Sequence, residues 1–282
     1  MATIVCLTFD FDAQSIWIGT FKQSTPTALS RGEFGARVGI ERILDVLAKQ
    51  EVRATFFVPG HTALTFPDEV RRIADAGHEI GAHNDVHETP VGLRRDEEAV
   101  IMERAEAALL KVAGAKPVGY RSPAWELSPN TITLLVERGY RYDSSLMADD
   151  FRPYRPRLFE TVEADGRVRF GPAAPLWEFP VAWELDDYPY FQFVHRPLNQ
   201  GLRSPHEVEA IWLAEFEYCH EAITNGLFTL TAHPEIIGRG PRISMLDRVI
   251  SRMKAASRVE FLTMSMAAEQ LAVRERGRDE IR

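Results

Sequence analysis

Short apolar runs alternate along the chain with segments in which apolar residues recur every three or four positions. Runs such as Ile4 to Phe9 and Ala54 to Val58 are typical of buried strands. Between them, residues 39–50 place Ile40 and Ile43 on one face, which predicts an amphipathic helix. Strands that alternate with helices favour parallel βαβ units. About seven or eight such units in one chain predict an α/β fold, a (β/α) barrel that is distorted or incomplete where its parallel strands are short.

The pattern continues to the C-terminus with two interruptions. Residues 14–37 are rich in Ser, Thr and Gly and are expected to form a long loop. Residues 148–175 are rich in Pro, Arg and Gly and are expected to be an irregular excursion, with a small hairpin at Asp165-Gly166. The charged tail from Arg274 is expected to fray. No linker divides the sequence, so residues 1–282 are expected to form a single domain. Further strands are expected at 79–82, 118–120, 177–183, 227–232 and 259–262, and further helices at 67–76, 94–112, 129–138, 204–224, 242–254 and from 265 onward.

Composition and charge narrow the class of protein. The chain has 282 residues, 45% of them hydrophobic, and a formal net charge of −8. No basic block stands out, so nucleic acid and anionic membranes are poor candidates as partners. The first apolar run lacks a basic leader and meets Asp10 early, which indicates a strand and not a signal peptide. No apolar run reaches the roughly 20 residues that span a bilayer. We therefore expect a protein of the cytoplasm.

Two carboxylates end the first predicted strand. Asp10 and Asp12 are two residues apart, so in an extended chain they point the same way, and a bend at the strand end can aim them at different partners. One of them can bind a metal ion while the other accepts a proton. The alternative is a polar turn, because Asp is common where strands lead into loops.

Two histidines follow the strand predicted at 79–82. His83 and His87 are four residues apart and would share one face of a helical turn, so both rings can reach one ion. Surface or capping histidines are the alternative. Two His ligands and one carboxylate leave positions open on a zinc-like ion, which is typical of a catalytic site and not of a closed structural one.

Arg121 and His233 also come directly after predicted strands. Arg121 can pair with a carboxylate and hold it ionised, with a surface Arg beside a turn proline as the alternative. His233 can donate a proton to a leaving group because imidazole titrates near neutral pH, although a lone His after a strand is more often structural. The carboxyl ends of parallel barrel strands converge on one face, so we expect these residues to meet the acids and the histidine pair there.

Weaker candidates lie near the same predicted strand ends. An acid close to the strand at 177–183 can orient His233, and aromatic residues can wall a pocket. The alternative is a half-buried strand followed by a solvated acidic loop. These candidates are Pro123, Trp125, Glu178, Trp183, Asp186 and Asp187.

Taken in order, these motifs resemble those of the polysaccharide deacetylase superfamily (carbohydrate esterase family four). The resemblance implies a distorted (β/α) barrel with Asp10 as general base, Arg121 as the partner of Asp10, and His233 as general acid. It also implies zinc or a similar divalent ion, with Asp12, His83 and His87 as its ligands. The ordered match spans nearly the whole chain and consists of Thr8-Phe9-Asp10-Phe11-Asp12, His83 to His87, Arg121-Ser122-Pro123 and His233.

Two features depart from the usual motif pattern. Phe11 separates aspartates that are usually adjacent and followed by Gly-Pro, and the long loop at 14–37 is unusual. Both resemble a subgroup that holds peptidoglycan-deacetylase-like proteins, cyclic imide hydrolases and metal-independent allantoinases, whose members tend to form homotetramers. The allantoinases lack the full ligand set that this chain retains, which favours a metal enzyme.

The resemblance implies a hydrolase of carbon–nitrogen bonds other than peptide bonds, and two substrate classes stay open. One is an N-acetylated sugar, which the enzyme would deacetylate. The other is a small cyclic imide or ureide, which is favoured because no secretion signal is recognised and an acidic chain gains no steering toward an anionic polymer. A third alternative, of another class, is a non-catalytic barrel that binds a metal ion or ligand. The retention of base, ligands and acid together argues against it.

Overall fold

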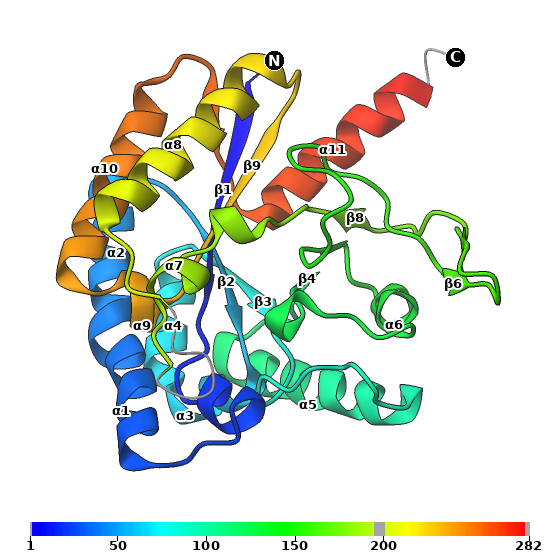
Figure 1. Ribbon diagram of the computed structural model, residues 1–282, viewed down its shortest axis with the longest axis horizontal. Helices are drawn as coiled ribbons and strands as arrows, with labels where there is room; N and C mark the ends of the chain where they lie inside the picture. The colour runs from blue at the N-terminus through cyan, green and yellow to red at the C-terminus, as the bar shows by residue number, and fades with distance from the viewer. Residues whose placement is uncertain (1, 195–200, 280–282) are drawn as a thin grey trace.

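A computed structural model describes residues 2–194 and 201–279 and shows a curled parallel sheet surrounded by helices (Figure 1). The sheet has eight strands in the order β10-β1-β2-β3-β4-β5-β8, with β9 paired to β1. A parallel bridge between Asp186 and Thr231 brings the segment after β8 beside β9, so the sheet curls toward closure. This incomplete (β/α) barrel confirms the predicted fold class. The strands are β1 (Thr3–Asp10), β2 (Thr55–Val58), β3 (Glu79–Ala82), β4 (Gly119–Tyr120), β5 (Tyr142–Asp143), β8 (Trp177–Glu178), β9 (Leu227–Ala232) and β10 (Val259–Phe261).

The first strand lies at the centre of the fold because all of β1 is buried. It pairs with β9 along most of its length, with β10 near its start and with β2 near its end. The helices bury their apolar faces against the sheet, as α2 does with Ile40, Ile43 and Leu47. The helices are α1 (Pro26–Phe34), α2 (Ile40–Gln50), α3 (Gly60–Thr65), α4 (Pro67–Asp75), α5 (Arg95–Ala113), α6 (Thr131–Glu137), α7 (Tyr188–Phe191), α8 (Pro205–Ala222), α9 (Pro234–Ile237), α10 (Gly240–Ala255) and α11 (Met264–Asp279).

The prediction of a long loop at residues 14–37 is wrong, because this segment is mostly helical. A π-helical turn η1 (Ile16–Thr20) leads to α1, and a second one, η2 (Gly35–Gly39), joins α1 to α2. Thr25 caps α1 by accepting a hydrogen bond from the Ala28 N–H, and Pro26 occupies the first helical position. A Cβ atom on Gly32 would lie 2.4 Å from the Ala13 backbone, so glycine here serves close packing and not a loop.

Several element boundaries also differ from the prediction. The strand expected at 177–183 ends at Glu178 and is followed by a 3₁₀ turn, η4 (Trp183–Leu185). The helix expected from Pro129 begins at Thr131. The tail was expected to fray from Arg274, but α11 continues to Asp279. Within this helix, the Arg274 side chain donates a hydrogen bond to Gln270 one turn earlier. The strand β5 and the helix α3 were not predicted, because two and six residues are too few to show a period.

The excursion at 148–175 is irregular, as predicted, and carries the predicted hairpin. Strands β6 (Thr161–Val162) and β7 (Val168–Arg169) pair antiparallel around the turn at Asp165-Gly166, where Gly166 has a φ of +84°. An antiparallel bridge between Tyr154 and Glu178 ties the excursion to β8. Within the described part of the chain, no helix is both long and apolar enough to cross a membrane.

Candidate metal and catalytic site

Polar side chains gather at the carboxyl end of the parallel sheet. Asp10 is the last residue of β1, His83 follows β3 directly, and Arg121 follows β4 directly. His233 follows β9, which lies beside β1. All of these side chains are buried. The structure therefore brings together residues that are more than 200 positions apart in the sequence.

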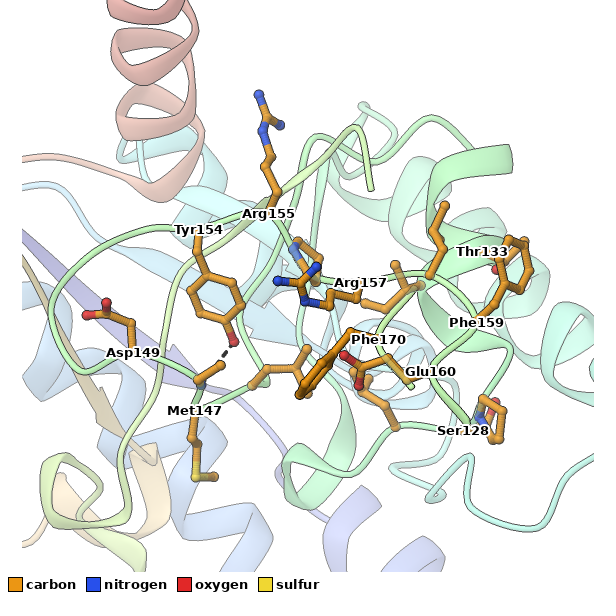
Figure 2. A pocket seen from close by; sticks show the side chains of 17 residues that line it. Ser128, Thr133, Met147, Asp149, Tyr154, Arg155, Arg157, Phe159, Glu160 and Phe170 are labelled. Atoms are coloured by element: carbon orange, nitrogen blue, oxygen red, sulfur yellow. Dashed lines mark hydrogen bonds between the residues drawn. The ribbon is translucent and has the colours of Figure 1, made fainter. Parts of the chain in front are cut away.

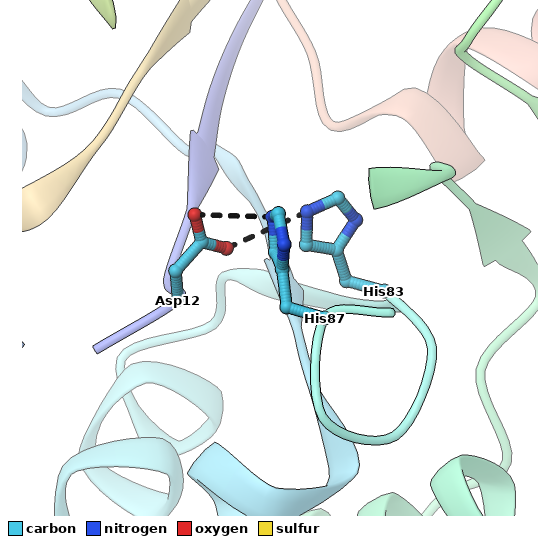
Figure 3. A group of neighbouring side chains, drawn as sticks. All are labelled: Asp12, His83 and His87. Atoms are coloured by element: carbon cyan, nitrogen blue, oxygen red, sulfur yellow. Dashed lines mark ion pairs between the residues drawn. The ribbon is translucent and has the colours of Figure 1, made fainter. Parts of the chain in front are cut away.

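Asp12, His83 and His87 form a compact group of possible metal ligands (Figure 3). One carboxylate oxygen of Asp12 lies 3.4 Å from Nε2 of His83, and the other lies 3.4 Å from Nε2 of His87. Neither oxygen has a hydrogen-bond partner among the described residues, although both are buried. A buried carboxylate without partners is costly, and burial raises the pKa of Asp12 well above its usual range. Such a group fits a bound cation.

The Nδ1 atoms of His83 and His87, which point away from Asp12, are held by hydrogen bonds. Nδ1 of His83 lies 2.7 Å from the Arg121 carbonyl oxygen, which can only accept, so the proton is on Nδ1. The Thr20 hydroxyl donates to the His87 carbonyl oxygen over 2.9 Å and therefore accepts from Nδ1 of His87 over 2.6 Å. Burial lowers the pKa of His83 to about 4 and that of His87 well below its usual value. Both rings are neutral at pH 7 and turn an Nε2 lone pair toward Asp12.

The histidine pair does not lie on a helical turn, so the predicted geometry is wrong. Residues 83–87 form a loop in which Asn84 and His87 have φ values of 55° and 57°. The Asn84 side chain donates to the Glu88 carbonyl oxygen and accepts from the Tyr120 hydroxyl, which stabilises this loop. The two rings nevertheless meet, with centroids 4.8 Å apart.

Asp10 is paired with a fully buried arginine. Its Oδ1 accepts a hydrogen bond from Arg121 over 2.8 Å, and its Oδ2 lies 4.0 Å from Nε2 of both His83 and His233. Burial alone would raise the pKa of Asp10, but the Arg121 charge outweighs it and holds the pKa below its usual value. Arg121 is itself fixed by the Ser144 carbonyl and hydroxyl oxygens and lies over the Phe57 ring at 4.3 Å.

His233 lies beside the two aspartates. Its Nε2 is 3.9 Å from Asp12, and its Nδ1 donates to Asp187 over 2.8 Å. Asp187 also accepts the His233 backbone N–H, while Asp186 lies 3.5 Å from Nδ1. Burial lowers the pKa of His233, but Asp186 and Asp187 outweigh it and hold the pKa well above its usual range. The ring is therefore a cation at neutral pH, with its Nε2 proton facing the site.

A pocket of about 160 Å³ opens above these groups. Asp10, His83, His87 and His233 contribute to its polar side, and its apolar wall includes the stacked rings of Trp125 and Trp183, whose centroids are 4.3 Å apart. The remaining lining residues are Ile16, Thr20, Phe21, Ala124, Asp186 and Tyr188.

The weaker candidates divide into two sets. Trp125, Trp183 and Asp186 line the pocket, whereas Pro123 is buried and does not. Glu178 does not orient His233, because its carboxylate accepts the backbone N–H groups of Ser145 and Leu146 beside β5.

The helical segment at 16–39 supplies site residues that were not predicted from the sequence. Thr20 holds His87, and Ile16 and Phe21 wall the pocket. The apolar positions of η1 within an otherwise polar stretch were the available signal.

Comparison with known proteins places the chain in a family. The model of the polysaccharide deacetylase family matches residues 4–142. A peptidoglycan deacetylase from Helicobacter pylori is 32% identical over 96% of this chain and 97% of its own length. The chain belongs to the polysaccharide deacetylase family. Its homologues indicate a hydrolase that acts on carbon–nitrogen amide bonds.

Solved structures agree with this membership in the polysaccharide deacetylase family. A Mycobacterium smegmatis structure, provisionally described as a polysaccharide deacetylase, is 37% identical, with a TM-score of 0.87 over 97% of this chain and 91% of its own. The allantoinase PuuE is 21% identical, with a TM-score of 0.75 over 95% of this chain and 89% of its own, and shows the shared fold alone.

Proposed function

We propose that this polysaccharide deacetylase family member is a metal-dependent enzyme that removes the acetyl group from an N-acetylated sugar. The observation that carries the proposal is the open group of Asp12, His83 and His87, with Asp10 and His233 within about 4 Å of it. The Helicobacter pylori relative, named a peptidoglycan deacetylase, matches nearly end to end and supports an N-acetylated sugar as the substrate class.

The three ligand residues fit a divalent ion, and we propose zinc. Two neutral imidazoles and one carboxylate are a ligand set typical of catalytic zinc, with positions left for water and substrate. The unpartnered oxygens of Asp12 are explained by such an ion. A bound ion would supply Lewis-acid polarisation of the amide carbonyl and of the attacking water.

Two side chains, Asp10 and His233, carry out the proton transfers. Asp10, kept ionised and oriented by Arg121, accepts the proton of the attacking water. We propose that a backbone N–H of the loop at Pro123 and Ala124, of which Ala124 lines the pocket, stabilises the negative charge that develops on the carbonyl oxygen. His233, held by Asp187, donates its Nε2 proton to the departing nitrogen.

The proposal is tested by acetate release from N-acetylglucosamine oligosaccharides, with the zinc-loaded protein and a chelator-treated control. Asp10→Asn should abolish turnover yet retain metal, and His83→Ala should lose metal, as measured by elemental analysis. The matched control is His206→Ala, since His206 is exposed on α8. Near-normal activity of Asp10→Asn would remove Asp10 as the base, and metal retained in full by His83→Ala would remove His83 from the ligand set.

The size of the pocket favours a second candidate, the hydrolysis of small cyclic imides or ureides. About 160 Å³ lies below the roughly 300–1,000 Å³ typical of pockets for larger ligands. The walls from η1 and the stacked tryptophans would suit a small planar ring. Loss of ultraviolet absorbance from succinimide, glutarimide and hydantoin tests this reaction. Metal-dependent ring opening without acetate release would replace the deacetylase proposal, and inactivity on both classes would favour a binding protein without catalysis.

The homotetramer and the cytoplasmic location expected from the sequence remain predictions. Light scattering of the purified protein and cell fractionation measure them directly.

A further inference from the structure

Two buried acids lie next to the residues that hold Arg121, the arginine that pairs with Asp10. Asp143 ends β5 and Glu178 ends β8, and the two residues are Cα partners in the register of these parallel strands. Side chains of register partners project from the same face of a sheet, so the two carboxyl groups are neighbours. Both residues are completely buried, and neither lines the pocket of Asp10 and His233. Their role is therefore not contact with a substrate in that pocket.

Ser145 connects the two carboxyl groups. Its hydroxyl donates to Oδ1 of Asp143 over 2.7 Å, and its backbone N–H donates to Oε1 of Glu178 over 2.9 Å. The Leu146 N–H donates to the same Glu178 oxygen over 2.9 Å. The other oxygens, Oδ2 of Asp143 and Oε2 of Glu178, are buried and accept from no donor among the described residues. An unpaired buried acceptor is costly, and one proton held between these two oxygens satisfies both.

The charges around the pair favour one proton as well. Two ionised carboxylates in contact repel each other, and burial adds the cost of desolvation. Burial raises the pKa of Asp143 to about 6, and burial together with the neighbouring Asp143 raises the pKa of Glu178 well above its usual range. The Arg121 charge favours the ionised form of Asp143. Glu178 is therefore the protonated member at neutral pH, and the pair carries one negative charge.

Ser144 holds the guanidinium of Arg121. Its carbonyl oxygen accepts from Nε of Arg121 over 2.9 Å, and its hydroxyl accepts from Nη2 over 2.9 Å. The same hydroxyl donates to the Phe179 carbonyl oxygen over 3.0 Å. Asp143 and Glu178 directly precede Ser144 and Phe179 in the sequence, so the acid pair fixes the residues that hold Arg121.

A second link to Arg121 runs through Ser145. The Ser145 hydroxyl, which donates to Asp143, accepts the Ser122 N–H over 2.9 Å. Ser122 follows Arg121 directly, so the backbone beside Arg121 and its side chain are both tied to the segment that the acid pair orders. Arg121 in turn donates to Oδ1 of Asp10 over 2.8 Å.

The excursion at 148–175 holds Glu178 from the other edge of β8. The Tyr154 and Glu178 backbones exchange two hydrogen bonds, of 3.1 and 2.7 Å. The Tyr154 hydroxyl accepts the Ala148 N–H over 3.1 Å at the wall of a pocket of about 600 Å³ (Figure 2). Glu178 is thus held on both sides, by β5 and by the excursion, and its carboxyl group has a fixed position.

We propose that Asp143 and Glu178 share one proton and act as positioning residues for Asp10, by holding Arg121 through residues 144 and 145. The inference rests on the deacetylase function proposed above, in which Asp10 accepts the proton of the attacking water. An arginine that moves leaves Asp10 without a fixed orientation, and a displacement of about 1 Å at a reacting group can cost about 100-fold in rate. The acid pair affects the rate of the chemical step and not substrate binding, because neither acid lines the pocket.

Amide substitutions test the shared proton. In Glu178→Gln, the Nε2 group donates to Asp143 in place of the proton, while Oε1 still accepts both backbone N–H groups. In Asp143→Asn, the Nδ2 group donates to an ionised Glu178 in the same way. Each single variant should keep kcat for acetate release within about threefold of the wild type. The double variant turns two NH₂ groups toward each other and should lower kcat about 100-fold, with KM and zinc occupancy unchanged.

Two further variants separate positioning from stability. Glu106→Gln is the matched control, because it breaks a buried pair with Arg138 on another part of the fold and should lower Tm without changing kcat. If the double variant does not fold, Ser144→Ala tests the link to Arg121. Loss of this hydroxyl should lower kcat about tenfold at unchanged KM.

Infrared difference spectra observe the shared proton directly. At neutral pH, the wild type should show the carbonyl stretch of a protonated carboxylic acid that Glu178→Gln and Asp143→Asn each remove. Absence of this band from both difference spectra would overturn the shared proton. A single amide variant that lowers kcat as far as the double variant would do the same.

The positioning role has its own contrary results. Wild-type kcat in the double variant, or in Ser144→Ala, would overturn it. If the wild type releases no acetate at all, the deacetylase proposal fails, and the acid band together with the position of Arg121 in crystals of the double variant tests the inference by itself. A displaced Arg121 supports the positioning role, and an unmoved Arg121 overturns it.

Discussion

We expect Thr20 to set the metal affinity of His87 through the two hydrogen bonds that it makes with this residue. Its hydroxyl accepts from Nδ1 of His87 over 2.6 Å and donates to the His87 carbonyl oxygen over 2.9 Å. These two bonds hold the ring with Nε2 toward Asp12 and keep the left-handed backbone at His87, where φ is 57°. Thr20→Val keeps the volume of the side chain and removes both bonds.

The size of the effect follows from what the substitution leaves behind. Removing a hydrogen-bond partner of a metal-binding histidine typically lowers metal affinity by about 10- to 100-fold. Nδ1 of His87 is buried, so an unpaired N–H there also costs about 1–3 kcal/mol of folding free energy. Thr20→Ser keeps the hydroxyl and should stay close to the wild type in both quantities.

The assay is a zinc titration in competition with a chromogenic chelator, paired with thermal unfolding of the metal-free protein. Thr65→Val is the matched control, because Thr65 makes one side-chain bond to the His61 carbonyl oxygen at the exposed end of α3. Wild-type zinc affinity in Thr20→Val would refute the idea that Thr20 orients His87. Equal losses in Thr20→Ser would assign the effect to packing and not to the hydroxyl.

Two further predictions concern the acid and the histidine loop. The pKa of His233 is raised by its carboxylate partners, so its donor form persists at neutral pH and is lost as pH rises through that raised value. Asp187→Asn removes one of these charges and should move the alkaline limb of kcat/KM to lower pH, and an unmoved limb would exclude His233 as the acid. A Cβ atom on Gly19 would lie 1.6 Å from the Val86 carbonyl oxygen, so Gly19→Ala should cost about 1–3 kcal/mol in thermal unfolding and weaken zinc binding. Gly240→Ala is its control, with nothing within 4 Å, and equal stability of the two variants would contradict the packing argument.

The location of the candidate catalytic and metal-binding residues at strand ends was predictable from the sequence, because it follows from a short-range pattern. Asp10, His83, Arg121 and His233 each end or directly follow an apolar strand, and parallel strands must present their carboxyl ends together. The apolar period also located the helix that became α2. These inferences needed only the sequence within a few residues of each site.

The remaining features depend on contacts that local sequence does not encode. Thr20 meets His87 across 67 positions, and no local pattern marks that pairing. Glu178 was one of three acids considered as partners of His233, but β8 pairs with β5 and turns its carboxylate toward Ser145 and Leu146. The glycines of the segment at 14–37 suggested a loop, whereas Gly32 is there because another backbone approaches closely.

The hydrogen bonds between Thr20 and His87 should link metal occupancy to the order of the helical segment from Ile16 to Gly39. Thr20 belongs to η1 and is hydrogen-bonded to His87, which is one of the three candidate metal ligands. A ligand that binds only the folded protein stabilises it by about 2.7 kcal/mol when its concentration is a hundredfold above Kd. Because Thr20 is hydrogen-bonded to His87, we expect zinc to slow amide hydrogen exchange in η1 as well as around the ligands.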